Sequence, residues 1–130
     1  MSVGVLLITH PGIGTSVLHS ARRIVDGCPL TTMCLDVPLD ANLERVRESA
    51  HKLIEQLDQG QGVLVLTDIF GATPNNIARS FALPGKVAVL AGLNLPMLVR
   101  VYNYPAAALD TLCDKAEEGG SRGIQQCAQQ

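Results

Sequence analysis

Short runs of apolar residues alternate with longer amphipathic stretches along the chain. The apolar runs are Val3 to Ile8, Thr31 to Val37, Val63 to Leu66 and Lys86 to Ala91. Short runs rich in β-branched residues and bounded by Gly and Pro predict strands. The first and third runs are almost continuously apolar rather than alternating, which is typical of a parallel sheet covered on both faces.

The stretches between these runs have the spacing of amphipathic helices. Asp40 is the expected N-cap of the second helix, and Thr73, followed by Pro74, is the expected N-cap of the third. The expected helices cover Val17 to Val25, Leu43 to Leu57, Thr73 to Phe81, Leu95 to Tyr102 and Pro105 to Glu118, the last ended by Gly119 and Gly120. The tail from Arg122 to Ala128 is a candidate edge strand.

This alternation of strands and helices predicts one α/β domain over residues 1–130. Right-handed crossovers place helices on both faces of a doubly wound, mostly parallel sheet. We expect four strands in the order 2-1-3-4, the flavodoxin-like order, with a possible C-terminal edge strand. In such sheets the loops at the carboxyl ends of the strands carry the chemistry.

Two residues at the carboxyl ends of neighbouring strands form the candidate site. His10 follows the first apolar run and Asp68 follows the third, so the predicted strand order makes them face each other. A carboxylate that accepts from one imidazole nitrogen fixes the tautomer and leaves the other nitrogen as a nucleophile. The helix that starts at Thr73 would offer backbone N–H groups to an anion at the same place. Together these groups are typical of phosphoryl transfer through a phosphohistidine.

Simpler interpretations stay open. A single histidine at a strand end is commonly a hydrogen-bonded turn residue, and an aspartate before a glycine-containing turn is commonly a local cap. The spacing Gly12-x-Gly14 begins a dinucleotide-binding fingerprint, but Val17 stands where the third glycine belongs. A flavodoxin-like nucleotide-binding protein is therefore a further hypothesis.

Composition excludes several other classes of protein. The net charge is −2 and there are two Phe, two Tyr and no Trp, so neither a basic stripe nor a base-stacking platform for nucleic acid is expected. The first apolar run lacks a basic flank and is too short to span a bilayer. Four cysteines without metal-ligand spacing predict reduced, mostly buried thiols. We therefore expect a cytoplasmic protein without direct membrane insertion.

Three motifs at the strand ends resemble one known family. They are Ile8-Thr9-His10, the stretch from Thr67 to Asn75, and the stretch from Gly92 to Leu98. With the glycine-containing end from Ala116 to Ile124, they make the chain similar over nearly its whole length to the mannose-type EIIA (PTS IIA) family of the bacterial phosphoenolpyruvate:sugar phosphotransferase system.

The resemblance implies a phosphotransferase that works without a metal or an organic cofactor. His10 would accept a phosphoryl group at Nε2 from an HPr-like phosphocarrier protein and pass it to a histidine of an EIIB subunit during sugar uptake. Asp68 matches the aspartate that orients the histidine in this family. Thr73 stands where the family has a hydroxyl residue near the phosphate, and Asn94 lies in the third loop of the site.

The resemblance also implies a homodimer, in which a C-terminal edge strand packs onto the neighbouring subunit. Two details depart from the family pattern. Pro11 removes one loop amide, so the phosphate would depend on later amides such as that of Gly12. Gly71 and Ala72 precede Thr73 where Gly-Gly-Ser is usual, and both are candidate phosphate-binding residues. An alternative function is a regulatory PTS module, whose His10 phosphorylation state controls binding to another protein without sugar transport.

Overall fold

A four-stranded parallel sheet forms the centre of the computed structural model, which describes residues 2–128. Its strands are β1 (Gly4–Thr9), β2 (Thr32–Asp36), β3 (Val63–Thr67) and β4 (Val87–Ala91). They lie in the order β2-β1-β3-β4 and all three neighbouring pairs are parallel. The predicted fold class and strand order are confirmed.

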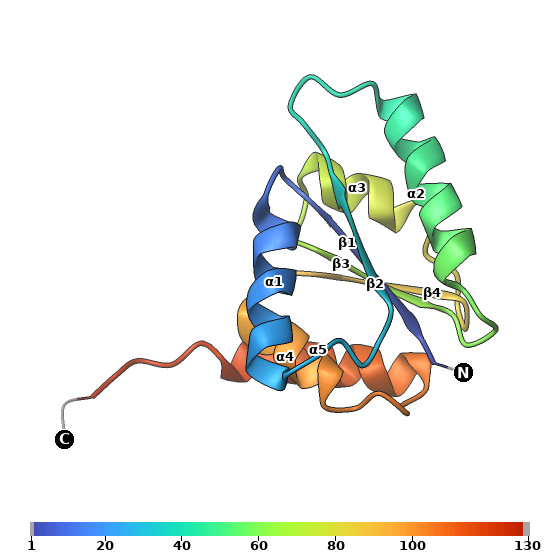
Figure 1. The fold of residues 1–130 in the computed structure, drawn as a ribbon. Coiled ribbons are helices and arrows are strands. Elements are labelled where there is room, and N and C mark those ends of the chain that lie inside the picture. Colours follow the sequence, from blue (N-terminus) through green and yellow to red (C-terminus); the bar gives the residue numbers. More distant parts are fainter. Residues whose placement is uncertain (1, 129–130) are drawn as a thin grey trace.

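Five helices cover the two faces of this sheet (Figure 1). They are α1 (Ile13–Val25), α2 (Leu43–Leu57), α3 (Thr73–Arg79), α4 (Leu95–Tyr102) and α5 (Leu109–Arg122). One apolar cluster joins the sheet to α1, α4 and α5, and a second joins the opposite face to α2 and α3. Every residue of β1 and β3 is buried, which explains why these two runs lack polar alternation.

Two of the expected helix caps are wrong. The N-cap of α2 is Asn42, whose side chain accepts a hydrogen bond from the Arg45 amide at 3.2 Å. Asp40 instead lies in the turn in which the Ala41 amide donates to the Pro38 carbonyl. The N-cap of α3 is Ala72, because Thr73 is already helical, and this helix ends at Arg79 rather than at Phe81.

The expected bounds of the last helix are also wrong. The helix begins at Leu109, four residues after the expected start, and continues through Gly119 and Gly120 to Arg122. These glycines allow α4 and α5 to approach closely, since a Cβ at Gly119 would overlap Cβ of Arg100. A glycine pair that reads as a helix stop in sequence is here a packing contact.

We predict that Gly119→Ala destabilises the protein although alanine is the better helix former. Alanine favours a helix interior by about 1 kcal/mol over glycine. The added Cβ would also lie 3.2 Å from the Pro96 carbonyl oxygen, and this overpacking should lower the free energy of unfolding by about 2 kcal/mol net. Urea unfolding measures the change, with the exposed Glu117→Ala on the same helix as control. A stabilised Gly119→Ala would contradict the packing role.

The candidate edge strand after Arg122 is not confirmed. Arg122 closes α5, and the described residues beyond Gly123 have no regular secondary structure. In Figure 1 this segment extends away from the body of the molecule, and Ile124 is 79% exposed.

The cysteines also differ from expectation, since Cys28, Cys34 and Cys113 are half-buried and Cys127 is exposed, although all four are free.

Candidate active site

His10 and Asp68 meet at the carboxyl ends of β1 and β3, as predicted. The sheet register pairs Ile8 with Thr67, so the residues that follow these two strands emerge side by side. Nδ1 of His10 lies 2.7 Å from Oδ2 of Asp68, and the His10 amide donates to the same oxygen at 3.1 Å. Since a carboxylate accepts, Nδ1 carries the proton. Nε2 has no hydrogen-bond partner among the described residues and holds the free lone pair.

The environment of Asp68 keeps its carboxyl group ionised. The side chain is only 8% exposed, and this burial raises its pKa. Hydrogen bonds from the ring and the backbone amide of His10 outweigh the burial, so the pKa lies below its ordinary value of 3.8. Asp68 Oδ1 is buried without a partner among the described residues. Among the described residues, the carboxylate of Asp68 therefore accepts hydrogen bonds from His10 only.

We predict that this contact makes stability depend on pH. Because the folded pKa of Asp68 lies below the unfolded one, its contribution is fully present above the ordinary value of 3.8 and is lost as the pH falls through the folded pKa. The free-energy gap between wild type and Asp68→Asn should therefore shrink on acidification. Denaturant unfolding of both proteins across this range measures the gap. A gap that is constant or grows at low pH would contradict the assignment.

Thr9 shapes the loop that presents His10. It is fully buried. Its hydroxyl group donates to the His10 carbonyl at 2.7 Å, and the hydroxyl oxygen of Thr9 accepts from the Gly14 amide at 3.0 Å. Gly14 allows α1 to start this close to the strand, because a Cβ there would lie 3.2 Å from Leu7 Cβ. Thr9 thus fixes both the end of β1 and the start of α1.

The side chain of Asn75 holds the turn that presents Asp68. This side chain is buried at 1% exposure. Its amide nitrogen donates to the Thr67 hydroxyl, and its oxygen accepts from the Gly71 amide, both at 3.0 Å. The buried network ties the end of β3 to the first turn of α3, so that Asp68 leaves the strand toward His10.

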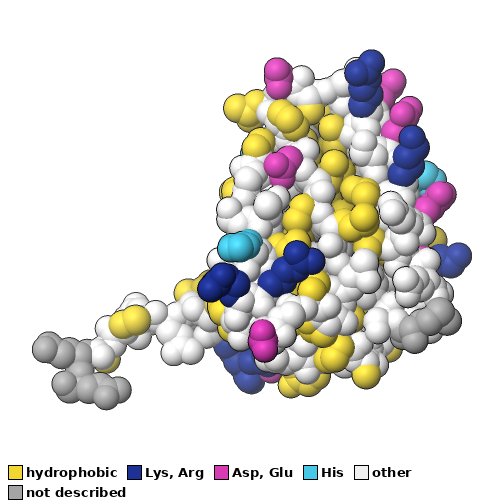
Figure 2. All heavy atoms as spheres, viewed as in Figure 1, with side chains coloured by type: hydrophobic (Ala, Val, Ile, Leu, Met, Phe, Trp, Pro, Cys, Tyr) yellow, Lys and Arg dark blue, Asp and Glu magenta, His cyan; other side chains and the backbone are white. Residues whose placement is uncertain are grey.

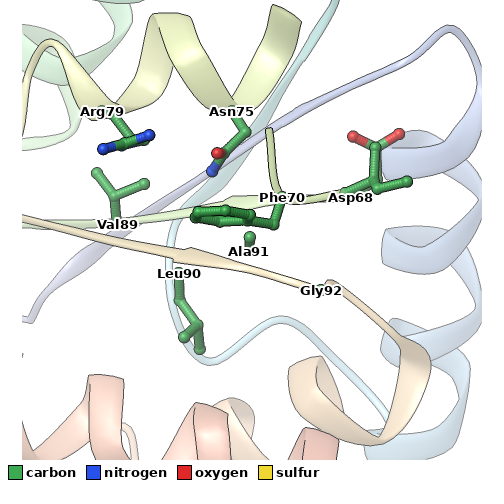
Figure 3. A pocket seen from close by; sticks show the side chains of 9 residues that line it. Asp68, Phe70, Asn75, Arg79, Val89, Leu90, Ala91 and Gly92 are labelled. Carbon is green, nitrogen blue, oxygen red and sulfur yellow. The ribbon is translucent and has the colours of Figure 1, made fainter. Parts of the chain in front are cut away.

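Two hollows flank the pair. His10 lines a cavity of about 230 Å³ together with Thr73 and Pro74 of α3 and with Leu39 and Leu43. A second, wider hollow of about 510 Å³ lies between α3 and the free edge of β4. In Figure 3, Phe70 lies in it between Arg79 of α3 and Leu90 of β4, and Asp68 stands at its end.

The structure brings only part of the predicted phosphate-binding set to His10. Thr73 lines the cavity, and neither its amide nor its hydroxyl donates to another described residue. The Gly12 amide donates to Asp36 at 3.3 Å, the Gly71 amide to Asn75, and the Ala72 amide to the Ile69 carbonyl at 3.4 Å.

Asn94 is engaged away from His10. It is the N-cap of α4, where its oxygen accepts from the Met97 amide at 2.9 Å, and its nitrogen donates to the Gly120 carbonyl at 3.1 Å. Its side chain therefore links the start of α4 to α5. A role for Asn94, Gly71, Ala72 or Gly12 in binding phosphate stays a prediction.

Sequence reasoning missed three residues of this site: Thr9, Asn75 and Asp36. Each uses its side chain to hold a loop amide or carbonyl, as described above. Thr9 ends β1 and Asn75 lies in the first turn of α3, and both are buried polar residues that require hydrogen-bond partners. Burial is not visible in sequence, but Thr9 directly follows the apolar run from Val3 to Ile8, and this position is a usable signal.

Neither a metal-binding cluster nor a membrane-spanning helix is found within residues 2–128. No cluster of three or more His, Cys, Asp and Glu side chains that could hold a metal is found there. None of the helices in the same part of the chain is long and apolar enough to cross a membrane.

Sequence comparisons identify relatives of this chain. The model of the EIIA-man family, described as "PTS system fructose IIA component", matches residues 4–117. A Bacillus subtilis (strain 168) protein named PTS system fructose-specific EIIA component is 32% identical over 89 residues, which is 67% of this chain and 61% of that protein. An Escherichia coli (strain K12) protein named PTS system mannose-specific EIIAB component is 28% identical over 95% of this chain and 39% of its own length.

The fold has close counterparts among solved structures. The mannose/sorbose-specific IIA subunit of the phosphotransferase system from Enterococcus faecalis superposes with a TM-score of 0.87, over 100% of this chain and 98% of that one, at 23% identity. An EIIA phosphotransferase component from Streptococcus agalactiae gives a TM-score of 0.81 over 95% and 96% of the two chains, also at 23% identity. With a family match over residues 4–117, this chain belongs to the EIIA-man family of PTS IIA components.

Proposed function

We propose that this chain is a cytoplasmic phosphotransferase that carries a phosphoryl group on His10 during sugar uptake. It accepts the group from an HPr-like phosphocarrier protein and passes it to an EIIB subunit. The observation that carries the proposal is the 2.7 Å contact between His10 Nδ1 and Asp68. This contact leaves Nε2 as the nucleophilic nitrogen on a side chain that is 33% exposed.

The chemistry is a displacement at phosphorus. The Nε2 lone pair forms a P–N bond, while the P–N bond of the phosphorylated donor breaks and its electron pair stays on the donor nitrogen. The Nδ1 proton remains with His10 throughout and donates to the Asp68 carboxylate, which stabilises the positive charge that develops on the ring. Transfer to the EIIB subunit repeats the same step in the outward direction.

Thr73 is the proposed donor to the phosphoryl oxygens. It lines the same cavity as His10. Neither its hydroxyl nor its amide donates a hydrogen bond to another described residue. As the first residue of α3, its N–H lacks a helical acceptor. The next residue, Pro74, has no N–H to offer, so Thr73 supplies the nearest donors from this side of the cavity.

An apolar rim around His10 is the proposed docking surface for both protein partners. The most exposed apolar side chains at this end of the molecule are Leu39 at 97%, Phe70 at 74% and Ile69 at 56%. Figure 2 shows hydrophobic side chains gathered at the end of the molecule where the loop between β2 and α2 lies. Exposed apolar groups grouped at one site mark protein interaction surfaces. The name EIIAB of the E. coli relative supports an EIIB partner.

Incubation with phosphoenolpyruvate, enzyme I and HPr tests the function. We expect intact-mass spectrometry to show one phosphoryl group per chain, which is lost on adding an EIIB subunit. No modification, under conditions that phosphorylate a control EIIA, would overturn the proposal. Acceptance from HPr without transfer to any EIIB from the same genome would favour the regulatory alternative.

We also propose a homodimer built on the free edge of β4. An edge strand exposes unpaired backbone groups. The sheet gives β4 a neighbouring strand on one side only, and on the other side its first residue, Val87, pairs with Leu83. The hollow lined by Phe70, Arg79 and Leu90 lies along this edge, and the C-terminal segment extends away from its own body in Figure 1. Residues 123–128 of one protomer would pair with β4 of the other.

Removal of residues 123–130 should convert the dimer into a monomer. The truncation removes no residue of a strand or helix, so circular dichroism should stay nearly unchanged while sedimentation reports half the mass. A full-length chain that is monomeric, or a truncated chain that is still dimeric, would contradict this pairing. The Gln125→Ala substitution in the full chain is the control that keeps the segment's length.

A further inference from the structure

Every backbone N–H group of residues 10–14 already donates to an acceptor. The His10 amide donates to Asp68, the Ile13 amide to the His10 carbonyl at 3.3 Å, and the Gly14 amide to the Thr9 hydroxyl. Pro11 has no N–H. The Gly12 amide donates to Oδ2 of Asp36 at 3.3 Å. Within residues 10–14, a phosphoryl group on His10 can therefore gain an amide only by displacing one of these acceptors.

The Asp36 contact is the one that can be exchanged at low cost. The other acceptors set the ring of His10 and the start of α1, whereas Asp36 is exposed and its bond to Gly12 lies at the surface. Its carboxylate returns to water when the bond breaks. Gly12 has a left-handed backbone with φ of 83° and nothing within 4 Å of a Cβ position, so the space beside this residue is open.

Two anions would then compete for one N–H group. Asp36 lies beside Thr9 in the register of β1 and β2, one residue from the phosphorylated histidine. A phosphoryl group is a stronger acceptor with a larger negative charge than a carboxylate, and the two like charges repel each other. The phosphoryl group therefore wins the amide.

We propose that Asp36 is a latch: it holds the Gly12 amide while His10 is unmodified and yields this amide to the phosphoryl group on phosphorylation. The proposal rests on the proposed function of His10. Asp36 ends β2, and the segment that follows it, with Leu39, forms the wall of the His10 cavity. Release of the latch thus makes the docking surface differ between the two phosphorylation states, which would let HPr and the EIIB subunit recognise different forms.

The test follows the Gly12 amide by ¹⁵N–¹H NMR in wild type and in Asp36→Asn. Potassium phosphoramidate, a small-molecule phosphoryl donor, modifies His10 without any protein partner. In the unmodified proteins we expect different Gly12 shifts, and in the phosphorylated proteins the same shift, because the phosphoryl group then holds the amide in both. A difference of equal size in both states would make Asp36 a structural residue and overturn the proposal.

A second readout separates the latch from a general charge effect. If Asp36 competes with the phosphoryl group, Asp36→Asn should shift the phosphoryl equilibrium with HPr toward this chain by about three- to tenfold. The control Asp40→Asn removes the same charge from the same exposed segment and should shift it by less than about twofold. Equal shifts in the two variants would contradict a specific role of Asp36.

The design also distinguishes failure of the latch from failure of the proposed function. A chain that HPr does not phosphorylate, but whose Gly12 shifts converge after phosphoramidate treatment, keeps the latch and loses the function. Where phosphoramidate leaves His10 unmodified, His10→Glu supplies a fixed negative charge. The Gly12 shifts of His10→Glu alone and of His10→Glu combined with Asp36→Asn should then converge. Persistent separation of these two shifts overturns the latch.

Discussion

His10→Ala abolishes phosphorylation by phosphoenolpyruvate, enzyme I and HPr, while the protein stays folded. The side chain is at the surface of the sheet's carboxyl end, 33% exposed, so its removal leaves both apolar clusters intact. Asp68 loses the ring N–H but keeps the backbone donor at position 10, and we expect a cost of about 1–2 kcal/mol in the free energy of unfolding. Radiolabel transfer and urea unfolding measure the two effects.

The other two histidines provide matched controls. His19 lies on α1, and His51 lies on α2, paired with Glu55 at 2.7 Å. Neither contacts the His10 cavity, so His19→Ala and His51→Ala should be phosphorylated at the wild-type rate. Residual labelling of His10→Ala, or loss of labelling in either control, would indicate that another residue carries the phosphoryl group.

Asp68→Asn should slow phosphorylation by up to roughly 10⁴-fold, the loss seen when an amide replaces the carboxylate that orients a catalytic histidine. The amide keeps the size of the side chain but loses the charge that stabilises the phosphorylated ring. It can also present its NH₂ group to Nδ1, which would favour the wrong tautomer. Stopped-flow mixing with phosphorylated HPr measures the rate.

Two comparisons guard this prediction against a simple loss of structure. The exposed Asp40→Asn should retain the wild-type rate, and circular dichroism should show Asp68→Asn folded. Phosphoramidate, which needs no protein docking, should also react more slowly with Asp68→Asn. A rate within about twofold of wild type would remove Asp68 from the mechanism, since loss of an orienting carboxylate costs far more.

The sheet could be predicted because its signal is local. The continuous apolar runs from Val3 to Ile8 and from Val63 to Leu66 are typical of strands buried on both faces, and β1 and β3 are indeed the two central strands. The order of parallel strands then brings His10 and Asp68 to the same edge. This pair follows from strand ends and topology together.

The details that could not be predicted depend on distant contacts. The glycine pair at Gly119 predicts the end of a helix, but α5 continues through it because α4 packs against this glycine. Asn94 has a polar side chain in a candidate loop, and the structure engages it at a helix start and at Gly120. The hydrogen bond from Gly12 to Asp36 joins two loops from neighbouring strands. Residue type alone does not reveal which of several polar neighbours takes a given amide.

Pro11 limits the conformations of the loop that carries His10, because the φ of proline is fixed. It lies between two amides that are each held by a carboxylate, Asp68 on the side of β3 and Asp36 on the side of β2. Pro11 thereby stiffens the loop around His10 without contributing a donor, and the donors that we propose for the phosphoryl group are Thr73 and the Gly12 amide.

The central claim is that Nε2 of His10 carries the phosphoryl group while Nδ1 stays bonded to Asp68. Long-range ¹H–¹⁵N NMR of the phosphorylated, ¹⁵N-labelled protein reads the two ring nitrogens of His10 separately. We predict a phosphorylated Nε2 and a protonated Nδ1. A phosphorylated Nδ1, or phosphate on any residue other than His10, would contradict it.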